Sequence, residues 1–507
     1  MIKYLLFLSL TLSSFADRKP NILFILCDDH RWDALSLMGH QFIKTPHIDK
    51  LAKNGAHFQN AYVTTSLCSP SRASILTGLY AHNHKVIDNN RKVGEDLVFF
   101  PQKLQQAGYE TAFIGKWHMG NDDSPQRGFD YWLAFQGQGT YYADNHGANR
   151  VVPQSSFNGF NINGKDRVSQ KGYITDELTD YALKWLDERP GKEKPFFLYV
   201  SHKAVHSDFV GRDGERGKYK HIKWNPPVSM ANTPENRAGK PRWVTDQRNS
   251  RHGMDFGYNL DFFNLEEYHK RYCEAITPVD DNVGRMVEYL KQKNELDNTI
   301  IVYTGDNGFN FGEHGLIDKR SAYEPSIHVP LIIHYPKKIK AGTKVKKIVA
   351  NIDIAPTLLE AAGVNQKLKN IDGKSFWPMA EGRSIPWRES LLYEYYWEWN
   401  YPQTPSVFAM ISEKYKFIRY HGVWDTDELY DMENDPHEMK NLYRVEEYKN
   451  VVLNMKRQLF DVLEKSNGTN VPFARDKNRQ FYYRHPERSQ PGDFPKWFYD
   501  KPAPVTE

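Results

Sequence analysis

Cysteine is scarce in this sequence, which contains only Cys27, Cys68 and Cys273 among 507 residues. So few cysteines in a chain of this length exclude a fold that depends on a framework of disulfide bonds. Cys27 closes an apolar run and Cys273 falls in a helical pattern, so we interpret these two as small buried residues rather than ligands. Cys68 differs because it directly precedes a polar segment that contains proline.

Blocks of like charge are also absent. The chain has 67 Lys and Arg against 63 Asp and Glu, which gives a formal net charge of only +4. A nucleic-acid-binding surface is typically a dense basic patch or stripe. We therefore predict no nucleic-acid partner.

Only one long apolar run occurs, and it lies at the N-terminus. Residues 4–12 are almost all apolar, they follow Lys3, and small residues stand at positions 14 and 16. This pattern is typical of a cleaved secretory signal, whereas the alternative, a membrane anchor, needs a longer run. We predict a signal peptide over residues 1–16, no membrane span in the mature chain, and a periplasmic or secreted location.

Strand-like and helix-like segments alternate from residue 20 onward. Residues 21–26 and 196–200 are apolar without alternation, as in strands covered on both faces. Residues 174–186 have helical spacing, and a longer helical pattern at about 266–293 is expected to be interrupted and kinked by Pro278. Further expected elements are strands at 111–114, 300–303 and 331–334 and a helix at 101–107. The alternation predicts an α/β fold with a large, mostly parallel sheet flanked by helices.

Two regions depart from this alternation. Residues from about 207 to 262 form a polar insertion that is too long for a simple connection. After about residue 386 the sequence turns to aromatic strands and turns, with a hairpin expected at 407–411 and 415–420. We predict a main domain over residues 17–385, which carries the insertion, and a smaller C-terminal α+β domain with an antiparallel sheet over 386–507.

Chemically active side chains follow four of the expected strands. These side chains are Asp28, Asp29, Lys116, His118, His206, Asp306 and Asn307. In open α/β sheets, ligands bind beyond the carboxyl ends of the strands. The sequence therefore predicts that these distant segments converge at one edge of the sheet.

Four of those side chains offer hard oxygen ligands, namely Asp28, Asp29, Asp306 and Asn307. Taken singly, an Asp pair after a strand can cap a helix and Asp-Asn-Gly can form a turn. Taken together at one sheet edge, they indicate a cation site, and oxygen ligands favour calcium, with magnesium also compatible.

Cys68 stands where a helix is expected to begin. Ser69 suits the N-cap, Pro70 the first helical position and Gly78 the end. A helix N-terminus favours an anion, and Arg72 lies one turn further along the same face. These features indicate an activated thiol beside an anion pocket, and the alternative is a structural cysteine.

The segment Cys68-Ser69-Pro70-Ser71-Arg72, followed by Leu76-Thr77-Gly78, resembles the signature of type I sulfatases in the alkaline phosphatase superfamily. Matching segments occur in the expected order over essentially the whole mature chain. They include Asp28-Asp29, Gly115 to Gly120, Asp306-Asn307-Gly308, Glu313 to Lys319 and Glu428 to Asp431.

The resemblance implies that a maturation enzyme oxidises Cys68 to formylglycine (3-oxoalanine), whose hydrate attacks the sulfur of a sulfate ester beside a calcium ion. It implies that Asp28, Asp29, Asp306, Asn307 and modified Cys68 hold the metal. It further implies that Arg72 steadies the hydrate and that Lys116 and Lys319 bind sulfate oxygens.

Two histidines divide the proton transfers that the resemblance implies. His206 resembles the general acid that protonates the leaving alcohol and contacts substrate, and His118 resembles the base that takes a proton from the hydrate. The family often has His-x-Pro-His in the general-acid region, whereas this chain has Ser201 to Ser207 without the proline. His202 is therefore the alternative to His206.

The insertion interleaves cationic and aromatic residues. They are Arg212, Lys218, Tyr219, His221, Lys223, Trp224, Arg242, Trp243, Arg248, Arg251 and His252. This composition suits a sulfated or uronic-acid-bearing polysaccharide, and a solvated loop is the alternative. Residues 128–132 and 137–142 also resemble segments of polysaccharide-active sulfatases.

We therefore expect a sulfatase, a sulfuric ester hydrolase, that acts on a sulfated carbohydrate such as an algal polysaccharide or a glycosaminoglycan oligosaccharide. The alternatives are a phosphate or phosphonate monoester hydrolase of the same superfamily and a non-catalytic protein that binds sulfated glycans.

Overall fold

The computed structural model describes residues 18–147, 159–250, 253–254, 264–365, 368–398, 401–421 and 425–470. The chain divides into two units, Met1–Asn470 and Val471–Glu507, and all of the described residues belong to the first. The expected signal peptide, residues 1–16, lies outside the described residues and stays a prediction. Within the described ranges, no helix has both the length and the apolar content that crossing a bilayer requires.

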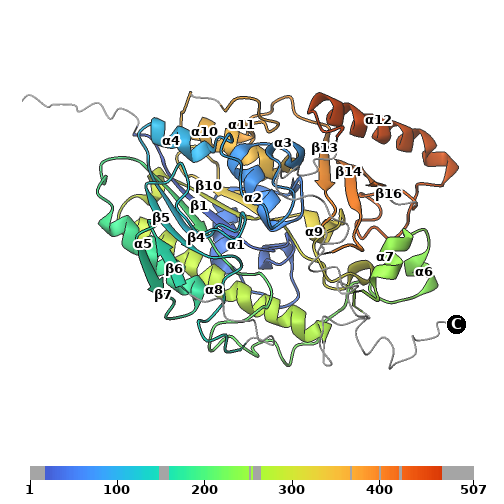
Figure 1. The fold of residues 1–507 in the computed structure, drawn as a ribbon, viewed down its shortest axis with the longest axis horizontal. Coiled ribbons are helices and arrows are strands. Elements are labelled where there is room, and N and C mark those ends of the chain that lie inside the picture. The colour runs from blue at the N-terminus through green and yellow to red at the C-terminus, as the bar shows by residue number, and fades with distance from the viewer. Residues whose placement is uncertain are drawn as a thin grey trace, which may run out of the picture. The chain divides into compact units, whose positions relative to one another are not determined.

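A ten-stranded mixed sheet forms the centre of this unit (Figure 1). Its strands, in spatial order, are β11 (Thr343–Val345), β2 (Ala56–Phe58), β10 (Leu331–His334), β9 (Thr299–Gly305), β1 (Asn21–Cys27), β8 (Phe196–Ser201), β4 (Glu110–Lys116), β5 (Tyr131–Phe135), β6 (Gly159–Ile162) and β7 (Asp166–Ser169). The five strands from β9 to β5 are parallel, and antiparallel pairs flank them on both sides. The predicted α/β fold is confirmed, with antiparallel edges added.

Strand β1 explains why the sheet is covered on both faces. Its side chains alternate, so Leu23 and Ile25 enter one core while Ile22 and Phe24 enter the other. Helices α1 (Pro46–Lys53), α5 (Ile174–Glu188) and α8 (Leu265–Gln292) supply the first core, and α2 (Cys68–Thr77), α4 (Phe100–Gln106) and α10 (Ile354–Ala361) supply the second. Figure 1 shows the two helical layers on opposite sides of the strands.

Helix α8 corrects one expectation, because it continues through Pro278 without interruption. Proline has no amide hydrogen, so the helix gives up one backbone hydrogen bond at that turn. Ile276, Val279 and Val283 are all buried in the core beneath α8. Packing of this apolar face outweighs the lost hydrogen bond.

A second sheet of four antiparallel strands follows the first. It consists of β13 (Ser390–Tyr395), β14 (Ser406–Ser412), β15 (Tyr415–His421) and β16 (Glu428–Asp431). The hairpin expected at 407–411 and 415–420 is confirmed as β14 and β15. Helix α12 (Lys449–Lys465) buries Val452, Met455, Leu459 and Leu463, whose spacing forms one helical face. The proposed boundary at residue 385 stays a prediction.

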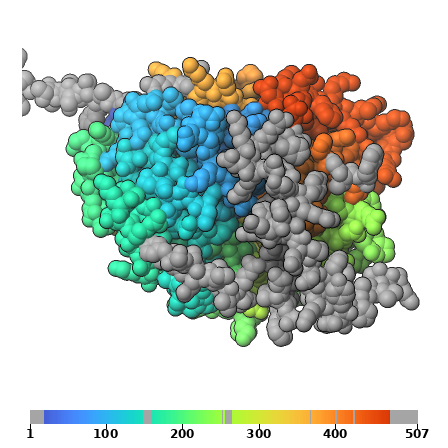
Figure 2. Space-filling view, in the orientation of Figure 1, coloured from blue at the N-terminus to red at the C-terminus, as the bar shows by residue number. Residues whose placement is uncertain are grey.

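Buried ion pairs join this second sheet to two short helices that precede it in the sequence. Nδ1 of His82, in α3 (Ala81–His84), lies 2.8 Å from a carboxylate oxygen of Glu394 in β13. Lys416 of β15 pairs at 2.7 Å with Glu324, which opens α9 (Glu324–Ile327). In the space-filling view, the red surface of α12 lies against the orange surface of preceding segments (Figure 2).

The polar insertion contains little regular structure. Within its described residues, 207–250 and 253–254, only α6 (Pro234–Arg237) and α7 (Arg242–Gln247) are helical. The remaining short elements of the unit are η1 (Ser36–Met38), β3 (Ala61–Tyr62), η2 (Leu296–Asn298), η3 (Glu313–Gly315), β12 (Val349–Ala350), η4 (Asn351–Asp353), α11 (Trp377–Ala380) and η5 (Glu446–Tyr448).

Several of the insertion's aromatic and cationic residues make internal contacts. The Tyr219 ring packs on Phe42, and the Trp243 ring packs on Tyr420. Arg212 pairs with Asp281. Arg251 and His252, which belong to the expected glycan platform, lie outside the described residues.

Gly115 is required by close strand packing and gives a stability test. Its φ is +125°, and a Cβ at this position would lie 1.9 Å from the backbone carbonyl oxygen of Ser201 in β8. We expect Gly115→Ala to lower the free energy of unfolding by about 3 kcal/mol or more, because a clash with backbone adds to the unfavourable φ. Urea unfolding measures the change.

Gly172→Ala is the matched control, because no atom lies within 4 Å of the Cβ it would introduce. Equal stability of the two variants would contradict the observed packing of β4 against β8.

Candidate active site

The four strands that carry the expected site residues are neighbours in the sheet, in the order β9, β1, β8, β4. They are parallel, so their carboxyl ends share one edge. Asp28 and Asp29 follow β1, Lys116 ends β4, and Asp306 and Asn307 follow β9. His206 lies in the loop after β8. The predicted convergence is confirmed for these segments.

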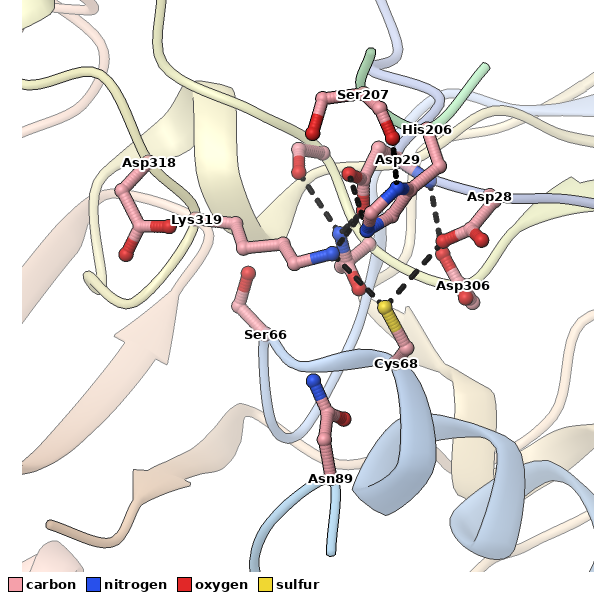
Figure 3. A network of polar contacts seen from close by, with 12 residues as sticks. Asp28, Asp29, Ser66, Cys68, Asn89, His206, Ser207, Asp306, Asp318 and Lys319 are labelled. Atoms are coloured by element: carbon pink, nitrogen blue, oxygen red, sulfur yellow. Dashed lines mark hydrogen bonds and ion pairs between the residues drawn. The ribbon is translucent and has the colours of Figure 1, made fainter. Parts of the chain in front are cut away.

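Helix α2 brings Cys68 to the same edge. Its thiol donates to Oδ1 of Asp28 at 3.4 Å, and Sγ lies 2.8 Å from Nζ of Lys319 and 3.9 Å from Nζ of Lys116. Figure 3 shows Sγ pointing from the helix N-terminus toward Asp28 and Lys319. The cysteine therefore faces the acidic and basic groups rather than an apolar core.

The start of α2 differs from the expectation in register. Leu67, not Ser69, is the N-cap, and Cys68 is the first helical residue. The Ser69 hydroxyl donates to the His118 carbonyl oxygen, while Asn89 Oδ1 accepts from the Ser69 amide at 3.0 Å. A side chain distant in sequence thus replaces the local cap. Gly78 ends the helix at φ 73°, as predicted.

Asp28, Asp29 and Asp306 form a buried acidic cluster. One carboxylate oxygen from each residue lies within 4.8 Å of the oxygens offered by the other two. Asn307 joins the cluster by donating through Nδ2 to Asp29 Oδ1 at 2.6 Å. Asp29 Oδ2 and Asn307 Oδ1 are buried without a hydrogen-bond partner. Buried oxygens rarely remain unpaired, so this donor set fits a hard divalent cation.

Three cations offset the acidic cluster. Lys116 donates to Asp28 and Lys319 donates to Asp29. Arg72 donates through Nε to Asp306 at 2.8 Å and through Nη1 to the Lys116 carbonyl oxygen at 2.7 Å. Arg72 thus contacts a carboxylate and a backbone carbonyl group, and its Nη1 also donates to Ser201 Oγ at 2.7 Å, a geometry that orients Asp306.

Burial and mutual repulsion perturb the acids. Burial, together with the charges of Asp28 and Asp306, raises the pKa of Asp29 to about 7 despite Lys319. Burial and Asp28 also raise the pKa of Asp306. For Asp28 burial acts in the same direction, but Lys116 and the other cations outweigh it and hold its pKa well below the ordinary value.

The thiol of Cys68 contradicts one expectation from the helix N-terminus. Burial, followed by the charge of Asp28, raises its pKa to about 12 rather than lowering it. Desolvation and nearby carboxylates outweigh the helix dipole and the two lysines. The prediction of an activated thiol is therefore wrong for the unmodified residue.

His206 and His202 differ in their surroundings. Nε2 of His206 lies 3.9 Å from Asp29 Oδ2, and His206 lies in one group with Asp28 and Cys68. His202 is fully buried, and neither of its ring nitrogens has a hydrogen-bond partner. Of these two histidines, only His206 lies beside the acidic cluster.

A family comparison decides the identity of this arrangement. The sulfatase family model matches residues 20–364. This chain belongs to the sulfatase family. A second model, N-sulphoglucosamine sulphohydrolase, C-terminal, matches residues 312–465. The protein is a sulfuric ester hydrolase of the alkaline-phosphatase-like fold.

Relatives of this sulfatase are similar along most of its length. An N-acetylglucosamine-6-O-sulfatase from Bacteroides thetaiotaomicron is 34% identical, over 89% of this chain and 86% of the relative. A protein solved in complex with its substrate D-glucosamine-2-N,6-O-disulfate is 32% identical, with a TM-score of 0.76 over 90% of this chain and 99% of the other. Another, solved with k-i-k-neocarrahexaose, is 27% identical, with a TM-score of 0.69 over 90% and 94%.

His118 lies in the same sulfatase site at an unusual backbone angle. Its φ is +50°, and its Nδ1 is buried without a partner. Burial, followed by the charge of Lys116, holds its pKa well below the ordinary value, so the ring is neutral at pH 7.

Sequence reasoning missed several residues that build the site. Gln138 Oε1 accepts from Nζ of Lys116 at 2.5 Å, and Ser201 Oγ accepts from Arg72 Nη1 at 2.7 Å. Gly137 and Gly139, on either side of Gln138, have φ of 57° and 63°. In the sequence, residues 137–142 stand out only by resemblance and Ser201 only as the start of the general-acid segment, which assigns a role to neither Gln138 nor Ser201.

Proposed function

We propose that this sulfatase removes a 6-O-sulfate from a glucosamine or N-acetylglucosamine residue of a sulfated carbohydrate. The observation that carries the proposal is the buried cluster in which Cys68 contacts Asp28 and two lysine ammonium groups, beside the three carboxylates of Asp28, Asp29 and Asp306. The relatives that act on or bind 6-sulfated glucosamines support the sugar. The segments at 128–132 and 137–142 are consistent with a carbohydrate substrate.

The proposed metal is calcium, for which magnesium is the alternative. Asp28, Asp29, Asp306, Asn307 and modified Cys68 would hold it, and the two unpaired buried oxygens support this donor set. Bound calcium would supply a positive charge that withdraws electron density from the sulfuryl group. Formylglycine, made from Cys68 by a maturation enzyme, would supply as its hydrate the hydroxyl that attacks sulfur and a second hydroxyl that permits release of sulfate.

The remaining residues bind the sulfate and move protons. The ammonium groups of Lys116 and Lys319 lie 3.9 Å and 2.8 Å from Cys68 Sγ. They would bind two sulfuryl oxygens, and their positive charge would offset the negative charge that develops on the sulfuryl group in the transition state. His206, protonated on both ring nitrogens, would give its Nε2 proton to the leaving sugar oxygen, and neutral His118 would take a proton from the hydrate. Arg72 would act by orienting Asp306.

The proposed place of action is outside the cytoplasm, in the periplasm or the medium. The N-terminal segment over residues 1–16 supports export, because its composition is typical of a cleaved signal. In this proposal residues 17–385 form the catalytic domain and residues 386–507 the C-terminal subdomain.

A substrate panel tests the proposal. Release of sulfate is measured from N-acetylglucosamine 6-sulfate, glucosamine-2-N,6-O-disulfate, neocarrahexaose sulfates and 4-nitrophenyl sulfate, with N-acetylglucosamine 6-phosphate as the matched phosphate ester. We expect the highest kcat/KM on a 6-sulfated glucosamine. Activity confined to the aryl ester, or a preference for the phosphate, would overturn the carbohydrate sulfatase proposal.

His206 and His202 give a second test. His206→Ala is expected to lower kcat on the sugar sulfate by about 10²-fold or more, since a general acid contributes roughly 10²- to 10⁴-fold. His202→Gln is expected to leave kcat within about threefold, because its ring does not reach the acidic cluster. The reverse pattern would assign the acid to His202.

A further inference from the structure

Lys203 carries a positive charge that the structure buries without an acidic partner. The residue is only 3% exposed. Among the described side chains, no carboxylate forms an ion pair with it; its Nζ lies 4.8 Å from the centre of the Tyr141 ring and 3.5 Å from the Ser207 carbonyl oxygen. Burying an unpaired ammonium group is costly, so its position calls for a physical reason.

The backbone around Lys203 leads directly to His206. The His206 amide donates to the Lys203 carbonyl oxygen at 3.0 Å, which closes a turn between the two residues. The same turn is bound to the end of β1, where Val205 donates to the Asp28 carbonyl oxygen at 2.7 Å and Asp28 donates to that of Ala204 at 3.0 Å. The position of His206 relative to Asp28 is therefore fixed by backbone hydrogen bonds.

The ring of His206 is held by the next carbonyl group. Nδ1 lies 2.6 Å from the Ser207 carbonyl oxygen, and a carbonyl oxygen can only accept, so the proton is on Nδ1. Nε2 is consequently the nitrogen directed at Asp29, as Figure 3 shows. The Tyr141 hydroxyl donates to the His206 carbonyl oxygen at 2.8 Å.

Lys203 and Tyr141 thus contact both carbonyl groups that flank the His206 ring. We infer that Lys203, stacked on Tyr141, is a positioning residue that holds the Ser207 carbonyl group so that His206 presents Nε2 to the leaving oxygen of the substrate. This inference rests on the proposed role of His206 as general acid. Without the ammonium group, the Ser207 carbonyl group is free to turn and the His206 ring loses its fixed orientation.

The dependence of the rate on the leaving group tests the inference. A sugar alkoxide must be protonated as it leaves, whereas 4-nitrophenolate is stable as an anion and needs little help. Lys203→Met keeps the apolar stem and removes the charge. We expect it to lower kcat on N-acetylglucosamine 6-sulfate by about tenfold or more, within the roughly 10²- to 10⁴-fold that a general acid supplies, and on 4-nitrophenyl sulfate by less than about threefold.

Three variants in the same protein make the result specific. Tyr141→Phe removes only the hydroxyl, so it should also lose more kcat on the sugar sulfate than on the aryl sulfate, but by a smaller factor than Lys203→Met. Gln138→Ala acts through the sulfate-binding Lys116 and should slow both esters by similar factors. His206→Ala must show the strongest dependence on the leaving group. If His206→Ala loses kcat equally on both esters, His206 is not the general acid and the proposed function is wrong on this point. If His206→Ala loses more on the sugar ester but Lys203→Met loses equally on both esters, only the inference about Lys203 is overturned.

A spectroscopic measurement decides the matter even if the aryl ester is a poor substrate. Nitrogen-15 spectra of histidine-labelled protein report which ring nitrogen carries the proton, and His206→Ala assigns the signal. For the neutral ring we expect only the Nδ1–H tautomer in the wild type, which makes Nε2 the nitrogen that gains the proton for the leaving oxygen, and a mixture of both neutral tautomers in Lys203→Met. An unchanged Nδ1–H signal in Lys203→Met would overturn the inference.

Discussion

Cys68→Ala is expected to lower sulfatase activity by at least about 10⁴-fold, because removal of a catalytic nucleophile has effects of this size or larger. The other groups of the site remain in this variant. Lys319 and Lys116, which lie 2.8 Å and 3.9 Å from Sγ, can still bind sulfate. The variant should therefore bind the sugar sulfate nearly as well as the wild type while failing to hydrolyse it, which calorimetry and sulfate release measure together.

Cys273→Ala is the control, since Cys273 is also buried but lies on the face of α8 that packs into the hydrophobic core. It is expected to lose stability and to keep its activity in the folded state. Mass spectrometry of the Cys68 peptide from active wild-type protein should show an aldehyde in place of the thiol. Full activity with an unmodified thiol, or a Cys68→Ala activity less than about 10²-fold below the wild type, would contradict the assignment.

Removal of the proposed divalent cation is expected to have the second largest effect, a loss of about 10³-fold or more in kcat/KM. Lewis-acid assistance accounts for part of this loss. The rest follows from the two lysines, which donate to Asp28 and Asp29 in the structure. A cation held by those carboxylate oxygens would free the two ammonium groups to bind the sulfate. Chelation should accordingly raise KM as well as lower kcat.

Stability should change in the same experiment. A cation at about 100 times its Kd stabilises the folded state by roughly 2.7 kcal/mol, so chelation should lower Tm and added calcium should restore it. Asp29→Asn is the matched variant, because it keeps the shape and removes one charge of the cluster. Its activity should fall and its Tm should respond little to calcium. Full activity after chelation would contradict the metal assignment.

The central strands, and the convergence of their carboxyl ends at one edge, could be predicted from particular residues, whereas the order of the strands in the sheet could not. The uninterrupted apolar run of β1 indicated a strand buried on both faces, and Asp28 directly after it indicated a site at its end. The same reasoning applied to β9 and Asp306. Helix α8 could be predicted in extent but not in continuity, because packing under Pro278 depends on residues from distant elements.

Other parts of the site depend on contacts that a single sequence does not reveal. Asn89, rather than Ser69, satisfies a backbone amide at the start of α2. The pKa of Cys68 is raised by burial and by the charges of Asp28 and Asp306, which local helix geometry cannot report. Lys203 shows no sequence signal apart from its place in the histidine segment, and its burial against Tyr141 is a tertiary feature.

The central claim is that one pocket at the sheet edge contains a modified residue 68, a divalent cation and the two lysines. A crystal structure of protein matured with a formylglycine-generating enzyme, grown with calcium and a 6-sulfated glucosamine, tests it most directly. The account predicts a cation contacting Asp28, Asp29, Asp306 and Asn307, and a sulfate group between residue 68 and Nζ of Lys116 and Lys319. Active protein whose Cys68 remains a thiol bound to Lys319, with no cation among the carboxylates, would contradict it.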